Sequence, residues 1–189
     1  CASNSNKVLT DFINSGTYDK RREFFKTISP SMDILVSSNL ERLLYNVTDE
    51  DAALVAGYMK RLNTEGVYQI DNDVLKRVQT EFFGAWVDEL ETKEAIGRIY
   101  GDYKYLMDTH TAVAHTVLRK YKKESKDYKS SLIISTASPY KFPRSICSAL
   151  GIAVENYNDF QVLDILNNYT KIPIPKNLRN LDTQPILHR

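Results

Sequence analysis

A cluster of small hydroxyl side chains follows a short aliphatic run late in the sequence. Leu132–Ile134 is followed by Ser135, Thr136 and Ser138, and then by a proline at position 139. A neutral hydroxyl at the end of a buried strand suits a hydrogen bond to a heteroatom of a ligand, where a charged partner would be wrong. The alternative is an ordinary turn, in which such residues are also common. The pattern therefore indicates a candidate binding segment, with a plain turn as the open alternative.

A second polar cluster follows another predicted strand, at Met32–Val36. Ser37, Ser38 and Asn39 come directly after it, at the predicted start of a helix. In open α/β sheets, ligands sit at the carboxyl ends of strands, so this position is a candidate for ligand contacts. Helix capping also accounts for serine and asparagine here, and both interpretations remain open.

A third candidate is the start of the predicted helix at 109–123. Asp108 can cap this helix, and the N–H groups of its first turn form a ready anion site. Capping alone requires no ligand. His110 and His115 are about 140° apart around a helix, so they do not share a face as a metal pair would. The third histidine, His188, is near the end of the sequence, and no metal site is expected.

The composition excludes several classes of function. The 189 residues are 42% hydrophobic and 26% charged, which is typical of a globular protein. The 25 basic and 24 acidic residues nearly balance and form no block, so nucleic acid is not an expected partner. No apolar run approaches the roughly 20 residues that span a bilayer. With two cysteines and no visible signal peptide, the expected location is the cytoplasm.

The elements that must position these residues alternate between strands and longer helices. This alternation predicts an α/β fold that is rich in helix. Strands are expected at 32–36, 67–70 and 132–134, and helices at 7–13, 40–45, 50–63, 71–83, 92–100, 109–123, 143–151 and 159–168. The chain begins with Cys1 and reaches its first helix almost at once. Because a domain rarely begins so abruptly, we expect the chain to be part of a longer one.

Four ordered motifs carry a resemblance to a known family. CASNSNKVLTDFINSGTYD, SPSMDILVSSNLERLLY, DTHTAVAHTVL and STASPYKFP occur in this order, and the tail IPIPKNLRNLDTQPI follows them. Together they resemble the C-terminal part of threonine synthases from fungi and many bacteria. The resemblance covers the whole chain, and one departure is Thr109, where the family usually has proline. Threonine is also a suitable residue for a helix start, so we expect little consequence.

The resemblance implies a pyridoxal-phosphate (PLP) enzyme of fold type II. Such an enzyme converts O-phosphohomoserine and water to threonine and phosphate, the last step of threonine biosynthesis. The implied fold is a partial, helix-rich, three-layer large domain similar to the tryptophan synthase beta subunit. Residues 1–16 would be a remnant of the small cofactor domain and residues 17–189 the C-terminal part of the large domain.

The resemblance also implies what this chain lacks. The family's Schiff-base lysine lies in an upstream FKD-type motif and its cofactor-phosphate loop in an upstream GNFGN-type motif, and neither motif occurs here. The missing N-terminal part of the same chain is therefore an expected partner. We expect the 189-residue chain alone to be inactive, with no catalytic residue of its own.

The candidate site residues follow from this resemblance and from the clusters above. In the family, the threonine of STASPYKF lies against the pyridine nitrogen of PLP, and here that residue is Thr136. A hydroxyl leaves this nitrogen largely unprotonated, so the ring is a milder electron sink than one that faces a carboxylate. Substrate contacts are expected from two clusters and one cation that could meet a phosphate: Ser31, Asp33 and Asn39; Asp108, His110 and Thr111; and Lys141.

Two alternatives remain open. One is a freestanding, non-catalytic α/β binding domain derived from such an enzyme, which the length of the encoded reading frame would reveal. The other is a related fold-type-II enzyme such as a threonine dehydratase. SPSMDI together with DTHTA favours the synthase, and a phosphate-release assay on the full-length protein would separate the two enzymes.

Overall fold

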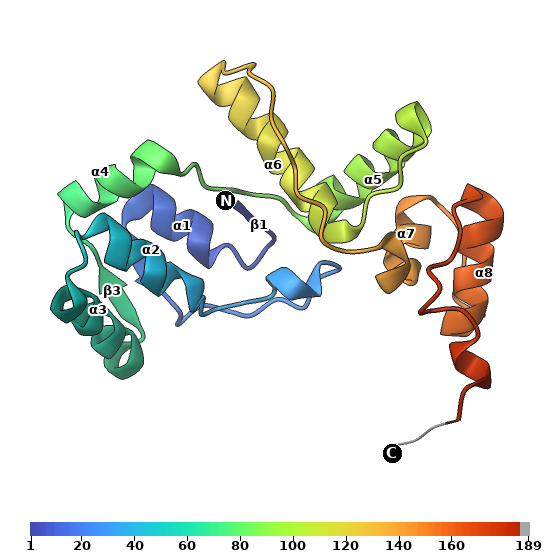
Figure 1. Ribbon diagram of the computed structural model, residues 1–189, viewed down its shortest axis with the longest axis horizontal. Coiled ribbons are helices and arrows are strands. Elements are labelled where there is room, and N and C mark those ends of the chain that lie inside the picture. The colour runs from blue at the N-terminus through green and yellow to red at the C-terminus, as the bar shows by residue number, and fades with distance from the viewer. Residues whose placement is uncertain (186–189) are drawn as a thin grey trace. The chain divides into compact units, whose positions relative to one another are not determined.

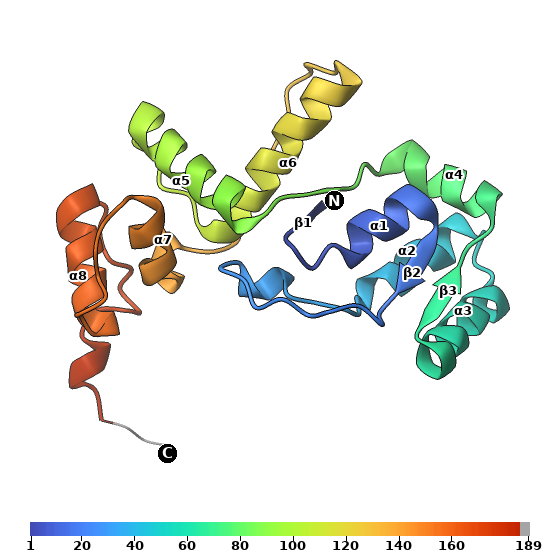
Figure 2. The same ribbon diagram turned by 180° about the vertical axis from the view of Figure 1, so that it is seen from behind.

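The computed structural model describes residues 1–185, and helices dominate it. Figures 1 and 2 show the elements from opposite sides. The described α-helices are α1 (Val8–Ser15), α2 (Asn39–Val47), α3 (Ala52–Glu65), α4 (Asn72–Glu81), α5 (Glu89–Tyr103), α6 (Thr109–Ser125), α7 (Pro143–Ala149) and α8 (Asp159–Thr170). Three short 3₁₀ helices are η1 (Pro30–Met32), η2 (Pro139–Lys141) and η3 (Leu181–Thr183).

The described strands form two small sheets. β1 (Ala2–Ser3) pairs in parallel with β4 (Ala85–Trp86). β2 (Thr17–Asp19) pairs antiparallel with β3 (Val67–Gln69), with Tyr18 opposite Tyr68. This combination of helices and short sheets is a helix-rich α/β fold, as the alternation of elements predicts.

The chain divides into two compact units. Unit 1 consists of Cys1–Thr92 and Val113–Ile133, and unit 2 of Lys93–Ala112 and the chain from Ile134 onward. The expected division of a full-length enzyme between residues 1–16 and 17–189 stays a prediction.

The core of unit 1 is built around aromatic rings on the β2–β3 pair. Tyr18 and Tyr68 are cross-strand partners, and their rings stack with centroids 5.4 Å apart and planes 2° apart. Tyr58 from α3 stacks on Tyr68 at 5.3 Å, and Phe12 from α1 meets Tyr18 edge-on at 5.9 Å. Figure 2 shows β2 and β3 together with α1 and α3. These large buried rings fix the helices on the sheet.

Two glycines join helices to the strands of this pair. Gly16 ends α1 with φ 76°, and its N–H donates to the Phe12 carbonyl oxygen at 2.7 Å. Gly66 ends α3 with φ 78° and a matching bond to the Leu62 carbonyl oxygen at 3.1 Å. Only glycine adopts this left-handed conformation without strain. β2 and β3 therefore each begin directly after the glycine that ends the preceding helix.

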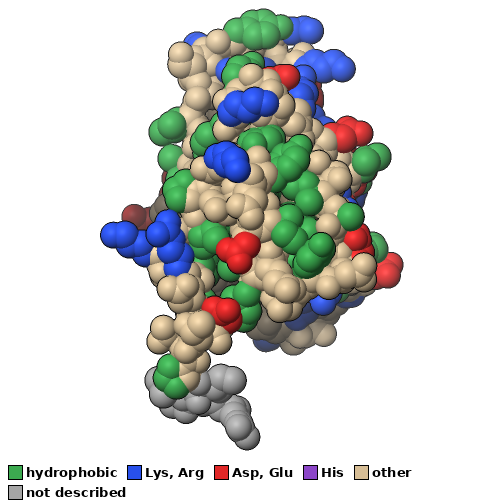
Figure 3. All heavy atoms as spheres, turned by 90° about the vertical axis from the view of Figure 1, so that its right-hand side faces the viewer, with side chains coloured by type: hydrophobic (Ala, Val, Ile, Leu, Met, Phe, Trp, Pro, Cys, Tyr) green, Lys and Arg blue, Asp and Glu red, His purple; other side chains and the backbone are tan. Residues whose placement is uncertain are grey.

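Unit 2 has its own core around α7 and α8. Ile146, Val162 and Leu166 are fully buried there, together with Ile96 from α5. Asn158 opens α8 with a capping box, in which Asn158 Oδ1 accepts from the Gln161 N–H and Gln161 Oε1 from the Asn158 N–H, both at 2.9 Å. The face drawn in Figure 3 shows hydrophobic side chains gathered among charged ones.

Two predicted strands are wrong. Met32–Val36 and Leu132–Ile134 are not strands in the described residues. A strand needs a neighbour that shares its ladder of hydrogen bonds, and no described segment supplies one for either run. The side chains of Leu132 and Ile134 are accordingly 85% and 69% exposed. The aliphatic composition of these two runs is suited to a strand. It does not determine whether another segment lies beside them to share the hydrogen bonds of a sheet.

Most other predicted elements are confirmed. The predicted strand at 67–70 corresponds to β3, and the predicted helices correspond to α1–α8 with shifted ends. α5 begins at Glu89 rather than at Thr92, whose hydroxyl donates to the Asp88 carbonyl oxygen at 2.7 Å inside the first turn. Among the described residues, no helix combines the length and the apolar character that crossing a membrane requires.

Candidate functional site

The start of α6 is built on a buried carboxylate. Asp108 directly precedes the helix, and its side chain is 0% exposed. Its Oδ1 accepts from the backbone N–H groups of His110 at 2.9 Å and Thr111 at 3.3 Å, which caps the helix. The Thr111 hydroxyl donates to its other oxygen, Oδ2. The predicted capping role of Asp108 is confirmed, and its carboxylate does more than cap.

The imidazole of His110 also faces this carboxylate. Its Nδ1 lies 3.1 Å from Asp108 Oδ1, and only 11% of the His110 side chain is exposed. An ionised carboxylate can only accept, so Nδ1 carries a proton and donates it to Asp108. The ring centroid lies 5.1 Å from that of Phe142. Asp108 and Phe142 together fix the tautomer and the orientation of His110.

Asp108 remains ionised because its partners outweigh its burial. Burial alone raises the pKa of this carboxyl, but the hydrogen bonds from His110 and Thr111 hold the pKa below its ordinary value. A folded-state pKa below the unfolded value adds stability above the unfolded pKa, near about 4. That contribution is lost as the pH falls through the folded pKa.

We therefore expect acidification below about pH 4 to destabilise unit 2 in part through Asp108. The measurement is the free energy of unfolding from denaturant titrations at several pH values, in the native protein and in Asp108→Asn. The variant should be less stable at neutral pH and should lose less stability on acidification. Asp164→Asn, at an exposed position of α8, is the matched control and should keep the native slope. An unchanged slope in Asp108→Asn would contradict this role.

The three hydroxyls after the aliphatic run have three different environments. The Ser135 oxygen lies 2.9 Å from the Thr111 hydroxyl oxygen and 3.5 Å from Asp108 Oδ2. The Ser138 oxygen accepts from the Tyr140 N–H at 3.2 Å and caps η2, so the plain-turn interpretation holds for Ser138. Thr136 is exposed, and within residues 1–185 its hydroxyl makes no hydrogen bond. Thr136 is therefore the hydroxyl of this segment that is available to a ligand.

Lys141 lies in the same unit as these groups. It ends η2, its side chain is exposed, and its Nζ lies 5.5 Å from the ring centroid of Phe142. His110 contacts the same ring. The structure thus brings Asp108, His110 and Thr111 into one cluster and connects Lys141 to it through Phe142.

The other predicted cluster lies in unit 1, where Asp33 is heavily engaged. Its carboxylate accepts from the side-chain amides of Asn4 at 2.7 Å and Asn6 at 3.0 Å. It also accepts from Thr27, through the N–H at 2.9 Å and the hydroxyl at 2.7 Å. Asn4 and Asn6 are both buried. Asp33 therefore ties the loop before η1 to the turn between β1 and α1.

The other two residues of the predicted cluster, Ser31 and Asn39, are both exposed. Ser31 lies in η1 with an exposed side chain. Asn39 is the first residue of α2, is exposed, and accepts a hydrogen bond from the Arg42 guanidinium. The substrate roles of Ser31, Asp33 and Asn39 stay predictions.

Sequence reasoning missed several residues of these clusters. One of them is Asn4, whose side-chain amide donates to Asp33 and to the hydroxyl of Ser29. The alternation of serine and asparagine at residues 3–6 (SNSN) was the feature of the sequence that could have indicated this network. Ser135 and Phe142 were present in the quoted motif without assigned roles, and no local spacing indicates their contacts with Thr111 and His110.

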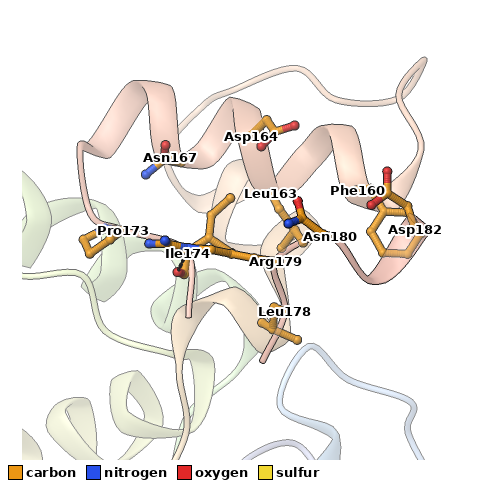
Figure 4. Close-up of a pocket in the computed structure, with 10 residues that line it drawn as sticks. All are labelled: Phe160, Leu163, Asp164, Asn167, Pro173, Ile174, Leu178, Arg179, Asn180 and Asp182. Atoms are coloured by element: carbon orange, nitrogen blue, oxygen red, sulfur yellow. Dashed lines mark hydrogen bonds between the residues drawn. The ribbon is translucent and has the colours of Figure 1, made fainter. Parts of the chain in front are cut away.

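A separate pocket of about 470 Å³ lies between α8 and the tail that follows it (Figure 4). The Arg179 side chain reaches toward Ile174, whose carbonyl oxygen accepts from Nε at 2.8 Å. Asp164 and Asn167 contribute from α8. None of the predicted site residues lines this pocket. Within the described part of the chain, no group of three or more His, Cys, Asp or Glu side chains could hold a metal ion.

Comparison with known proteins shows that the chain is similar to the C-terminal part of threonine synthases. The family model described as "Threonine synthase, C-terminal" matches residues 111–185. Threonine synthase-like 1 from Mus musculus is 42% identical over 176 residues, which cover 93% of this chain and 23% of that protein. The crystal structure of threonine synthase from yeast matches with a TM-score of 0.81 at 30% identity, covering 97% of this chain and 37% of that one.

A second solved structure is the PLP-bound threonine synthase from Brucella melitensis. It matches with a TM-score of 0.72 at 30% identity, covering 90% of this chain and 39% of that one. The chain thus spans less than two fifths of the length of each of these relatives. Its helix-rich α/β fold corresponds to part of a fold-type-II domain. Residues 111–185 belong to the threonine synthase C-terminal family, and the chain as a whole is a homologue of threonine synthases.

Proposed function

We propose that this chain is the C-terminal part of a threonine synthase. The complete enzyme converts O-phosphohomoserine and water to threonine and inorganic phosphate. The observation that carries this proposal is the match to the yeast enzyme over 97% of the chain. It is supported by the position of Thr136, next to a cluster of groups suited to a phosphorylated amino acid. A cytoplasmic location fits the two cysteines, which are unpaired.

The residues present fit one end of PLP. Thr136 offers an exposed neutral hydroxyl that would hold the pyridine nitrogen. Asp108, whose Oδ2 lies 3.5 Å from the Ser135 hydroxyl oxygen, is buried and already accepts from His110 and Thr111. A neutral partner for the nitrogen is therefore what this unit supplies. PLP, when bound, provides an electron sink for the carbanions that such a reaction must form.

The remaining groups suit the phosphorylated substrate. Lys141 is exposed and supplies a point charge for the phosphate. His110, oriented by Asp108, supplies an imidazole, a group that can hold or pass a proton. Ser31, Asp33 and Asn39 belong to the proposal as further substrate contacts, in which Asp33 acts mainly by holding its loop.

The test is product formation by the full-length protein with PLP and O-phosphohomoserine. We expect equal amounts of threonine and phosphate, measured by chromatography and a phosphate assay. The 189-residue chain alone is expected to form neither, because the lysine that would bind the cofactor covalently belongs to a motif it lacks. Saturable PLP binding through one lysine of the isolated chain, mapped after borohydride reduction, would contradict this expectation.

A second candidate is a homologue that no longer makes threonine. The identity to threonine synthase-like 1, 42%, exceeds the 30% identity to the yeast threonine synthase structure, and this difference favours it. This candidate includes a domain that binds a ligand but catalyses no reaction. Full-length protein that binds PLP but yields no threonine would support this candidate over the synthase.

A further inference from the structure

We propose that Thr111 is a positioning residue for Thr136, which it holds through Ser135. The inference rests on the proposed function, because it assigns Thr136 to the cofactor. The relevant contact is between Thr111 in the first turn of α6 and Ser135, which immediately precedes Thr136. Their hydroxyl oxygens lie 2.9 Å apart. Consecutive Cα atoms are about 3.8 Å apart, so an anchor at Ser135 fixes the backbone at Thr136 closely.

The segment around Thr136 needs such an anchor. No helix or strand is assigned between Lys126 and Ser138, and within the described chain no backbone–backbone hydrogen bond involves Ser135 or Thr136. The Ser135 hydroxyl has two polar contacts, with the Thr111 hydroxyl at 2.9 Å and with Asp108 Oδ2 at 3.5 Å, and the contact with Thr111 is the shorter of the two.

Thr111 is itself rigidly held. Its hydroxyl donates to Asp108 Oδ2, and its N–H donates to Oδ1 of the same side chain. Asp108 is fully buried, and His110 contributes two further contacts to it. Bonds to an ionised acceptor are stronger than neutral ones. The carboxylate thus fixes the Thr111 oxygen in the position from which it contacts Ser135.

Helix capping does not account for the Thr111 hydroxyl. The cap requires only the backbone N–H of Thr111, which any residue but proline provides. Threonine is also a poorer helix former than alanine or leucine. The side chain is 94% buried, since its exposed fraction is 6%. The hydroxyl donates to Asp108 Oδ2 and also contacts Ser135, so it links the capping carboxylate to the segment that carries Thr136.

The test uses the full-length protein with Thr111→Val, which keeps the shape and removes the hydroxyl, and Thr111→Ser as the matched control. Limited proteolysis without cofactor, by a protease of broad specificity, is the first readout. We expect faster cleavage within 134–137 in Thr111→Val and near-native cleavage in Thr111→Ser, with the rest of unit 2 little changed. A native cleavage rate at 134–137 in Thr111→Val would overturn the inference, whatever the activity.

Cofactor affinity is the second readout. Thr111→Val should weaken PLP binding by about 2- to 10-fold, as loss of one hydrogen-bonded restraint implies. Because the effect acts through Thr136, it should vanish when Thr136→Val is already present. Additive losses in the double variant would overturn the inference. Failure of the proposed function gives a different result. Thr136→Val would then leave PLP affinity unchanged, while Thr111→Val would still loosen residues 134–137.

Discussion

Replacing Thr136 with valine in the full-length protein is expected to weaken PLP binding, or turnover, by roughly 5- to 150-fold. Valine keeps the shape of threonine but removes the hydrogen-bonding oxygen. The pyridine nitrogen would then be buried without a partner, which costs about 1–3 kcal/mol. Spectroscopic titration of the protein with PLP measures the affinity, and product formation measures the rate. The effect on folding should be small, because the Thr136 side chain is exposed.

Two further substitutions make this result specific. Thr136→Ser keeps the hydroxyl and should be nearly silent. Thr136→Asp should favour a protonated ring nitrogen and direct the reaction toward side products. If Thr136→Val kept native cofactor affinity and turnover, Thr136 would be a turn residue like Ser138, and the binding interpretation of the STASPYKF motif would fail.

Replacing Phe12 with alanine should lower the free energy of unfolding by about 3–5 kcal/mol. Phe12 is 0% exposed and contacts both Tyr18 and Tyr68, with ring centroids 5.9 and 6.1 Å apart. The variant loses the buried apolar surface and leaves a cavity between α1 and the β2–β3 pair. Because domains are stable by only about 5–15 kcal/mol, unit 1 would be unfolded to a substantial degree under mild denaturing conditions.

The matched control lies in the same unit. Phe24→Ala removes the same ring at a position that is 53% exposed, and it should cost much less than Phe12→Ala. Denaturant titration followed by circular dichroism gives both values under the same conditions. Equal losses in the two variants would show that the aromatic stack is not the core of unit 1.

The helices were predictable because their determinants are local. Apolar residues recur on one face of each helix, and this spacing depends only on neighbours within four residues. The left-handed conformations of Gly16 and Gly66 are also local and end two helices where the strands begin. The start of α6 at Asp108 follows from the same kind of capping preference.

The strands show the limit of this local information. Leu132–Ile134 and Met32–Val36 have the composition of strands, yet neither is a strand in the described residues. Strand formation requires hydrogen bonds to another segment, and the sequence of the run says nothing about where that segment lies. By contrast, β2 and β3 pair with each other, and Tyr18 and Tyr68 stack across the pair.

The family resemblance, the helices and the residue types of the candidate site follow from the sequence alone. Which of these residues contact one another depends on the tertiary structure. It joins Asp33 to Asn4 and Asn6, and Thr111 to Ser135, across 27 to 29 and 24 positions of the chain. Such contacts depend on how the chain returns to itself, whereas backbone preferences act between near neighbours. For that reason the motifs identified Thr136 and Asp108, but the connection between them through Thr111 required the folded chain.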